Sequence, residues 1–404
     1  MAVPKKYKKT FLACFLGIMN QSVVGSVTAI LFVPFMSLYG FRLWQLGVLI
    51  GTGFITQVFA DIMLTFFVDK FGFRPQVNIA LALSLIGILF FASTPYIFAE
   101  TDMFIGIITA TILFSFPSGM LEVLISPIVE NVPSEQNEKG GIMSLIHSFY
   151  AWGQIFIIVI ISLYVFIAGK AYWNLILYFL AIIPIVSFIA FSIAPLDKRE
   201  TLEKKKSKIF FSPYFVIACI AIMAGGASEL IINQYVSTFT ELSLGFSKLA
   251  SDLFGMCMFA ALFGFGRTLY GSRLGKKLNL HKLLIIGSLI TAGLYLVAGL
   301  SPVPAVSLVA CILCGFTVSL LWPGTLVVAG EKFHTSGAWI FSVLAVAGDV
   351  GAGIGPMLTG FLANAANLET AIAVSAVIPL VSFICHIGLY RNAPATVPPL
   401  KKPR

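Results

Sequence analysis

The sequence predicts an all-α polytopic membrane protein with twelve membrane-crossing helices in two six-helix bundles. Three observations lead there: the apolar composition, the number of long apolar stretches, and the sorting of basic residues between alternate connections. Of 404 residues, 58% are hydrophobic and 11% charged, and the mean hydropathy is +0.97. A bilayer-crossing helix needs about 20 mostly apolar residues. The chain therefore has room for a dozen such helices and leaves none for a soluble domain.

Charged residues, Gly and Pro divide the apolar sequence into twelve stretches. In chain order the expected helices cover residues 10–38, 43–67, 76–98, 103–127, 141–168, 172–194, 211–239, 247–270, 283–300, 303–329, 337–363 and 371–390. The first stretch follows a basic N-terminus, but it is too long for a removable signal peptide and lacks a small-residue cleavage site. We expect it to stay in the mature protein.

The basic residues test this division, because one missed helix would exchange the sides of all later connections. Of the 26 Lys and Arg residues, Arg42, Lys170 and Lys248 lie in odd-numbered connections, Arg267 lies inside the eighth helix, and the other 22 lie in even-numbered connections and the termini. Positive residues favour the cytoplasmic side. We therefore expect a bacterial-type cytoplasmic (inner) membrane with both termini in the cytoplasm. The net charge of +9 is then a topology signal, with no nucleic-acid partner implied.

One long polar interruption, PLDKRETLEKKKSK, follows the sixth helix. It divides the chain into an N-terminal six-helix bundle (1–194), a cytoplasmic linker (195–210) and a C-terminal six-helix bundle (211–404). Two parallel repeats of six helices are typical of transporters that bind substrate near the midplane between the halves. A weak repeat supports this interpretation, since the turns at 68–74 and 271–277 carry Gly72 and Gly275 at matching places.

The turn Asp69-Lys-Phe-Gly72-Phe-Arg74 resembles the D-R-x-G-R-[RK] turn of the major facilitator superfamily between helices two and three. Gly permits a tight turn, and a carboxylate at a helix end can pair in one conformation only. We expect Asp69, Lys70, Gly72 and Arg74 to form a cytoplasmic gate. The alternative is an ordinary charged turn that satisfies the positive-inside bias.

Ionisable side chains at the bilayer centre cost about 2.5 to 3.5 kcal/mol on insertion scales, so each needs a partner or a function. The densest group spans the fourth and fifth helices. Glu122 and Ser126 are one turn apart, and Ser144, His147, Tyr150 and Gln154 share one helix face. Glu122 and His147 are candidates to relay a proton. The alternative is a structural pair between helices.

The second half adds Glu229 and Asn233, one turn apart on the seventh helix, as a cavity wall or a helix–helix contact. Asp349 lies in a glycine-rich stretch that ends at Pro356. With little side-chain cover it is expected to meet water and to be a third proton-coupling candidate, although the stretch also suits packing. Arg267 lies near a helix end and could snorkel to the interface, so it is a weak candidate for substrate contact. Asp61 also lies toward a helix end and is a weak candidate as well.

The stretches Leu121-Glu122-x-x-x-Ser126-Pro127 and Ser144-Leu-Ile-His147-Ser-Phe149-Tyr150-Ala-Trp152-Gly153 are similar to motifs of the fucose, glucose and galactose proton symporters. The resemblance implies that Glu122 carries a proton and that Tyr150 takes the place of a sugar-binding Asn. Asn20 and Gln21 stand where that family has an acid. The full set of substrate-cavity candidates is Asn20, Gln21, Ser126, Tyr150, Gln154, Glu229 and Asn233.

These features predict a secondary transporter for a small polar solute, sugar-like in its chemistry, driven by proton symport; a drug or metabolite/proton antiporter is the alternative. The sequence has no phosphate-binding loop and no converging catalytic set, so we expect neither an enzyme nor a cofactor. Cys311-x-x-Cys314 has no adjacent His or acid and is interpreted as packing, not as a metal site. The expected partners are the solute, protons and the lipid bilayer, and the expected state is a monomer.

Overall fold

The computed structural model describes residues 5–130, 132, 139–196, 212–271, 278–332 and 339–392. Within these ranges every regular element is a helix. Twelve helical spans are long and apolar enough to cross a membrane, which confirms the predicted number. The protein is therefore an all-α, multi-pass membrane protein.

The first half holds five single-helix spans and a sixth built from two segments. These are α1 (Lys8–Tyr39), α2 (Leu43–Phe71), α3 (Phe73–Ile97), α4 (Met103–Glu130), α5 (Lys139–Ala168), and α6 (Leu175–Leu180) with α7 (Ile182–Ile193). The expectation that the fourth helix ends at Pro127 was wrong. α4 continues through Pro127 to Glu130. A proline removes only one backbone hydrogen bond from a helix, and packing against neighbouring helices in a membrane protein can stabilise the remaining turns.

The second half is more interrupted. Its spans are α8 (Pro213–Leu242), α9 (Lys248–Ala250) continued by the π-helix η5 (Ser251–Cys257) and α10 (Met258–Gly271), then α11 (Leu280–Leu300), α12 (Pro304–Val318) with α13 (Leu321–Lys332), α14 (Trp339–Ala365), and α15 (Leu368–Ser375) with α16 (Val377–Arg391). π-Helical turns inside α-helices often occur at functional sites.

Three breaks within the spans, one in the first half and two in the second, have one physical cause. Pro184, Pro323 and Pro379 are each the third residue of the segment that follows the break. Proline has no backbone N–H, so the carbonyl four residues earlier loses its helical donor and the helix opens there. At the break before Pro323 this carbonyl belongs to Ser319, which becomes available to a side chain from another helix.

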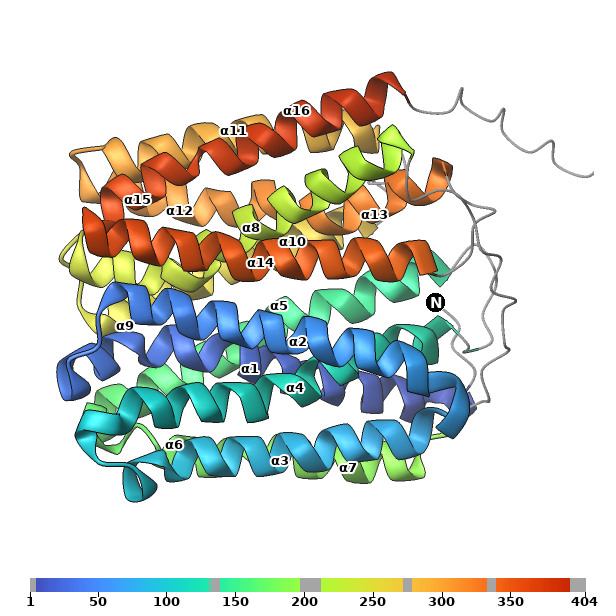
Figure 1. Cartoon of the computed structure of the whole chain (residues 1–404), viewed down its shortest axis with the longest axis horizontal. Coiled ribbons are helices and arrows are strands. Elements are labelled where there is room, and N and C mark those ends of the chain that lie inside the picture. Colours follow the sequence, from blue (N-terminus) through green and yellow to red (C-terminus); the bar gives the residue numbers. More distant parts are fainter. Residues whose placement is uncertain are drawn as a thin grey trace, which may run out of the picture.

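The two halves lie side by side with their helices roughly parallel, and Figure 1 shows α14 of the second half lying beside α2 of the first. Packing between the halves also joins α5 to α10 and η5, and α1 to α8. α1 begins and α16 ends at the same end of the molecule, on the right of Figure 1, which we call the termini side. The other end is called the opposite side.

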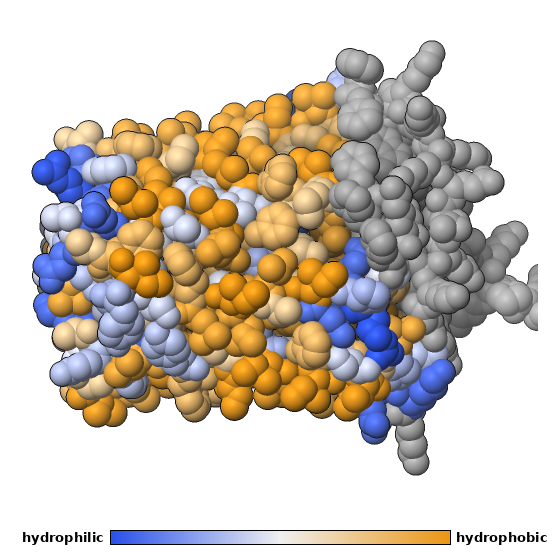
Figure 2. Space-filling model, turned by 60° about the horizontal axis from the view of Figure 1, so that its bottom comes forward, coloured by the Kyte–Doolittle hydropathy of each residue, from blue (hydrophilic) through white to orange (hydrophobic). Residues whose placement is uncertain are grey.

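The outer surface fits a lipid environment. Figure 2 shows a broad hydrophobic band along the body of the molecule, with hydrophilic residues gathered toward its ends. Large apolar side chains are exposed on this surface, including Phe166, Ile167, Phe179, Ile193 and Ile384. A soluble protein rarely exposes so continuous an apolar area, whereas a bilayer covers it.

The glycines of α14 allow it to pack closely on both halves. A Cβ added at Gly351 would overlap the carbonyl of Met223 on α8, and one added at Gly353 would lie 3.0 Å from Phe54 Cβ on α2. Small residues are what lets helix backbones approach in membranes. The glycine-rich stretch is thus a packing surface that places Asp349 between the halves.

We expect Gly351→Ala to lower the unfolding temperature of the detergent-solubilised protein, measured by intrinsic fluorescence. The added methyl group meets the Met223 carbonyl, and overpacking of this kind costs about 1–3 kcal/mol. Gly293→Ala is the matched control, because nothing lies within 4 Å of its added Cβ and Ala is the better helix former. Equal unfolding temperatures for the two variants would contradict the close packing of α8 and α14.

Candidate functional site

The centre of the site is an ion pair inside the second half. Arg267 Nη2 on α10 donates to Glu229 Oε2 on α8 at 3.2 Å, with 15% and 6% of the two side chains exposed. Arg267 Nε donates to the Ser319 carbonyl at 3.1 Å, the carbonyl that Pro323 leaves without its helical donor. The guanidinium also lies over the Phe263 ring, 4.0 Å from its centroid. Snorkelling of Arg267 to the interface was therefore a wrong expectation, because these groups hold it inside the protein.

The first half brings Glu122 and Tyr150 to this ion pair. Glu122 of α4 lies within electrostatic range of Arg267, and Tyr150 of α5 within range of Glu122, Glu229 and Arg267. The Tyr150 hydroxyl packs against Gly25 of α1, where no side chain blocks it. Two carboxyls from different halves thus act on one guanidinium. Four of these side chains, Glu122, Tyr150, Glu229 and Arg267, are called the central cluster below.

Two amides near the central cluster have no hydrogen-bond partner among the described residues. Gln154 follows Tyr150 by one turn on α5, and Asn233 follows Glu229 by one turn on α8. Their side chains are 0% and 1% exposed, and neither the nitrogen nor the oxygen of either amide is hydrogen-bonded. Leaving buried amides unsatisfied costs free energy, so such groups usually meet water or a ligand. Both were predicted as cavity residues.

Asp349 and Asp61 form a second polar feature, at the contact between α14 and α2. Their side chains lie close enough to interact with each other, and Glu122 lies within electrostatic range of both. Asp349 is only 2% exposed, because α14 packs closely on α8 and α2, and its Oδ2 has no hydrogen-bond partner among the described residues. That it meets water stays a prediction. Sequence reasoning singled out each Asp but did not pair them.

The remaining predicted residues lie in various surroundings. Asn20 Nδ2 donates to Ser84 Oγ on α3 at 2.9 Å, and Gln21 Nε2 donates to the Ser118 carbonyl on α4 at 3.2 Å. Asn20 therefore joins two helices of the first half and lies apart from the central cluster. Ser126 is partly exposed, one turn from Glu122. The backbone of His147 belongs to α5, but its side chain, like that of Ser144, lies outside the described part of the structure.

The predicted gate is described in part. The side chains of Asp69 and Lys70 lie outside the description. Gly72 joins α2 to α3 with φ +71°, a conformation that favours glycine. Arg74 donates to the carbonyls of Ser192 and, at 2.7 Å, of Ala194, at the C-terminus of α7. A cation stabilises a helix C-terminus, so Arg74 ties α3 to α7 within the first half.

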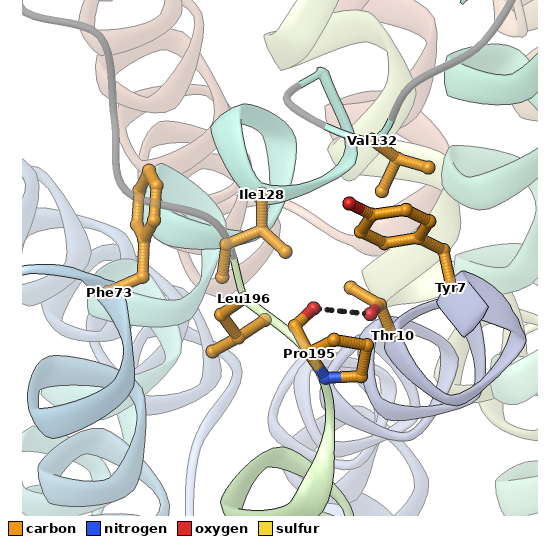
Figure 3. Close-up of a pocket in the computed structure, with 7 residues that line it drawn as sticks. All are labelled: Tyr7, Thr10, Phe73, Ile128, Val132, Pro195 and Leu196. Atoms are coloured by element: carbon orange, nitrogen blue, oxygen red, sulfur yellow. Dashed lines mark hydrogen bonds between the residues drawn. The ribbon is translucent and has the colours of Figure 1, made fainter.

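A small pocket lies near the start of α1, at the termini side (Figure 3). It is lined by Tyr7, Thr10, Phe73, Ile128, Val132, Pro195 and Leu196. Thr10 Oγ1 donates to the Pro195 carbonyl at 2.6 Å. Most of the lining is apolar, and the hydrogen bond fixes the chain that leaves α7 to the start of α1. The pocket is a packing feature of the first half.

Asp252 makes a polar contact between the halves that the sequence analysis missed. Its carboxylate is fully buried on the π-helix η5 and accepts hydrogen bonds from Lys248, from Ser237 of α8 and, at 2.7 Å, from Ser162 of α5. Lys248 and Asp252 are four residues apart, a spacing at which opposite charges pair on a helix, so this contact could be read from the sequence. Ser162 comes from the other half, and nothing in its sequence context marks it. The contact lies toward the opposite side.

We expect Lys248→Met to destabilise the protein by about 3 kcal/mol, because it leaves the buried carboxylate of Asp252 without its cation. Thermal unfolding in detergent measures this. The double variant Lys248→Met with Asp252→Asn should recover most of the loss, since it removes the unpaired charge. A single variant as stable as the unmodified protein would show that the pair is not formed.

The described residues include no group of three or more His, Cys, Asp or Glu side chains that could hold a metal ion. Cys311 and Cys314 are fully buried in the apolar core of the second half. Their role in the described structure is packing, which matches the behaviour of free cysteines in apolar surroundings.

The model of the Major Facilitator Superfamily matches residues 10–342 and 269–404, and the chain belongs to this superfamily. No curated protein matches the sequence. The structure is similar to a D-xylose-proton symporter (TM-score 0.79, 14% identity, 96% of this chain and 98% of the other). It is also similar to a bacterial homologue of the human lysosomal transporter Spinster in an inward-facing, occupied conformation. That match has a TM-score of 0.77 and 13% identity over 96% of this chain and 98% of the other.

A variant of the E. coli fucose:proton symporter matches as well, with a TM-score of 0.67 and 18% identity over 95% of this chain and 99% of that one. At such identities the likeness shows the fold. The family resemblance read from the turn after the second helix is confirmed.

Proposed function

We propose that the protein is a secondary active transporter that moves a small polar solute of sugar-like chemistry across a cytoplasmic membrane by proton symport. The observation that carries the proposal is the convergence of the central cluster with two unsatisfied amides, from both halves, at the membrane interior. Amides, a phenol and ion-paired carboxyls are the groups that recognise hydroxylated ligands by hydrogen bonds. The sugar:proton symporters among its structural relatives agree with this assignment.

Symport fits the acid content of the site. Glu122 acts on Arg267 from the first half while Glu229 pairs with Arg267 from the second. One guanidinium is attracted by two carboxyls. Protonation of Glu122 removes its negative charge and leaves Glu229 as the only anion of the pair. We assign Glu122 as the residue that binds the coupled proton and Glu229 with Arg267 as the charged wall of the solute site.

Alternating access fits the contacts between the halves. Gln234 Nε2 of α8 donates to the Gly25 carbonyl of α1 at 2.8 Å, and Ser162 bonds Asp252 toward the opposite side. Both are hydrogen bonds between the halves, and contacts of this kind can break as one half rocks on the other. With the termini in the cytoplasm, they would close the site to the outside in this conformation.

A thermal-shift screen of the purified protein tests the solute class. Sugars and related polyols are expected to raise the unfolding temperature, whereas amino acids, nucleosides and cationic compounds should leave it unchanged. A ligand at 100 times its Kd stabilises by about 2.7 kcal/mol, which such a screen resolves. The loss of this shift in Gln154→Leu and Asn233→Leu would connect it to the two amides. A shift with cationic compounds alone would reject the sugar assignment and favour a drug antiporter.

A further inference from the structure

We infer that the hydrogen bond from Ser162 to Asp252 is a latch whose making and breaking sets the balance between a closed and an open opposite side. The latch joins α5 of the first half to the π-helix η5 of the second. It shares no residue with the central cluster. The inference deepens the proposed function, and it rests on that function only for the expectation that the two halves move apart.

The two carboxylate oxygens of Asp252 have partners in different halves. Oδ1 accepts hydrogen bonds from Lys248 and from Ser237 Oγ, both in the second half. Oδ2 accepts a hydrogen bond from Ser162 Oγ at 2.7 Å, across the contact between the halves. The side chain of Asp252 is 0% exposed, so in this conformation Ser162 satisfies an oxygen that water does not reach. When the halves part, the bond to Oδ2 is the one that must break.

The charge of Asp252 stays balanced when this bond breaks. Lys248 Nζ also donates to Ser237 Oγ at 3.0 Å, so the ammonium, the Ser237 hydroxyl and Oδ1 contact one another within the second half. Removing one partner of a buried ion pair is costly. Movement of α5 away from η5 leaves the ion pair intact and exchanges only the Ser162 hydroxyl for water at Oδ2. The latch can therefore open and close without separating opposite charges.

A second contact joins the halves at the opposite side, between α2 and α14. Trp44 stacks on Phe361 with 6.3 Å between ring centroids, and a Cβ added at Gly47 would lie 2.9 Å from the Met357 carbonyl oxygen. This contact is close packing of rings and backbone, which is non-directional. A hydrogen bond weakens steeply when its geometry is disturbed. The Ser162–Asp252 bond is therefore the part of the closure that responds to a small displacement between the halves.

Loss of the Ser162 hydroxyl acts on one conformation only. With the opposite side closed, Ser162→Ala leaves Oδ2 of Asp252 buried without a donor. With that side open, water takes the place of the hydroxyl and the variant loses nothing. One hydrogen bond to a charged group changes an equilibrium by about tenfold to about a hundredfold. We expect the ratio of open to closed protein to rise by about this factor.

Distance measurements between spin labels test the latch in the full-length protein in lipid nanodiscs, without solute. Labels are placed on cysteines introduced at Ile97, at the end of α3, and at Leu300, at the end of α11, in a background with the native cysteines replaced. Both side chains are exposed, and α3 and α11 lie toward opposite edges of the molecule in Figure 1. We expect Ser162→Ala to raise the population of long distances. Labels at Ile97 and Ile167, both in the first half, should show no change.

Three further variants separate the latch from a general effect on the fold. Ser162→Thr keeps the hydroxyl and is expected to keep the distances of the unmodified protein. Ser187→Ala is the matched control, because it removes a similarly buried hydroxyl that donates to the Ile183 carbonyl of its own helix. Lys248→Met with Asp252→Leu removes the carboxylate and its cation together. Adding Ser162→Ala to that double variant should change nothing further, because no bond remains to be lost.

An unchanged distance distribution in Ser162→Ala would overturn the inference. So would an equal shift in Ser187→Ala, or a further shift of the same size in the protein without the carboxylate. The readout uses neither solute nor a proton gradient. Failure of the latch therefore leaves the proposed solute and its coupling standing, and failure of either of those leaves the latch measurable.

Discussion

Replacing Glu122 by Gln should abolish uphill accumulation of solute in proteoliposomes while leaving counterflow exchange intact. A one-proton symporter accumulates solute up to about tenfold for each pH unit across the membrane, since one pH unit is worth about 1.4 kcal/mol. Gln keeps the size of the side chain but cannot release a proton. Solute still binds beside Arg267, so exchange of labelled for unlabelled solute continues.

Glu100→Gln is the matched control for this variant, because it removes an exposed carboxyl outside the central cluster. It is expected to accumulate solute as the unmodified protein does. Uphill accumulation that survives in Glu122→Gln at the full level would reject the assignment of the coupled proton to Glu122.

Replacing Arg267 by Met should abolish solute binding and destabilise the protein by about 3–5 kcal/mol. Glu229 would be left 5% exposed and without its cation, and removing one partner of a buried ion pair carries a penalty of this size. Thermal unfolding measures the stability. Binding of the solute found in the screen is measured by the ligand-induced shift in unfolding temperature.

The double variant Arg267→Met with Glu229→Gln separates structure from function. It is expected to regain most of the stability, because no unpaired charge remains, but not solute binding. A double variant that regains both would show that the ion pair only supports the fold. An Arg267→Met protein as stable as the unmodified one would contradict the pairing itself.

The fold was predictable from the sequence because every membrane-crossing helix must meet the same requirement for length and apolar composition. A bilayer demands about 20 apolar residues, and the basic residues sort to alternate connections, so the twelve helices are visible without tertiary information. Their interiors were not. Only the structure shows that the Ser319 carbonyl, which Pro323 leaves without its helical donor, accepts a hydrogen bond from Arg267.

The sequence singles out residues of the candidate site one by one, but it does not predict how they pair. Burial cost alone singles out Glu122, Glu229 and Asp349, since an acid inside a membrane needs a reason. Arg267 was misplaced because its position near a helix end hid the depth of its side chain. The proximity of Asp61 to Asp349 and the hydrogen bond of Ser162 to Asp252 join residues from different halves, and no local pattern in the sequence encodes such contacts.

The sign of the proton movement tests the central claim most directly. Solute is added to proteoliposomes that hold the unmodified protein, with the membrane potential clamped by an ionophore, and a pH electrode follows the weakly buffered external medium. Symport through the central cluster predicts that the medium becomes alkaline as solute enters, and that Glu122→Gln gives no change. An acid shift, or an alkaline shift of equal size in Glu122→Gln, would contradict it.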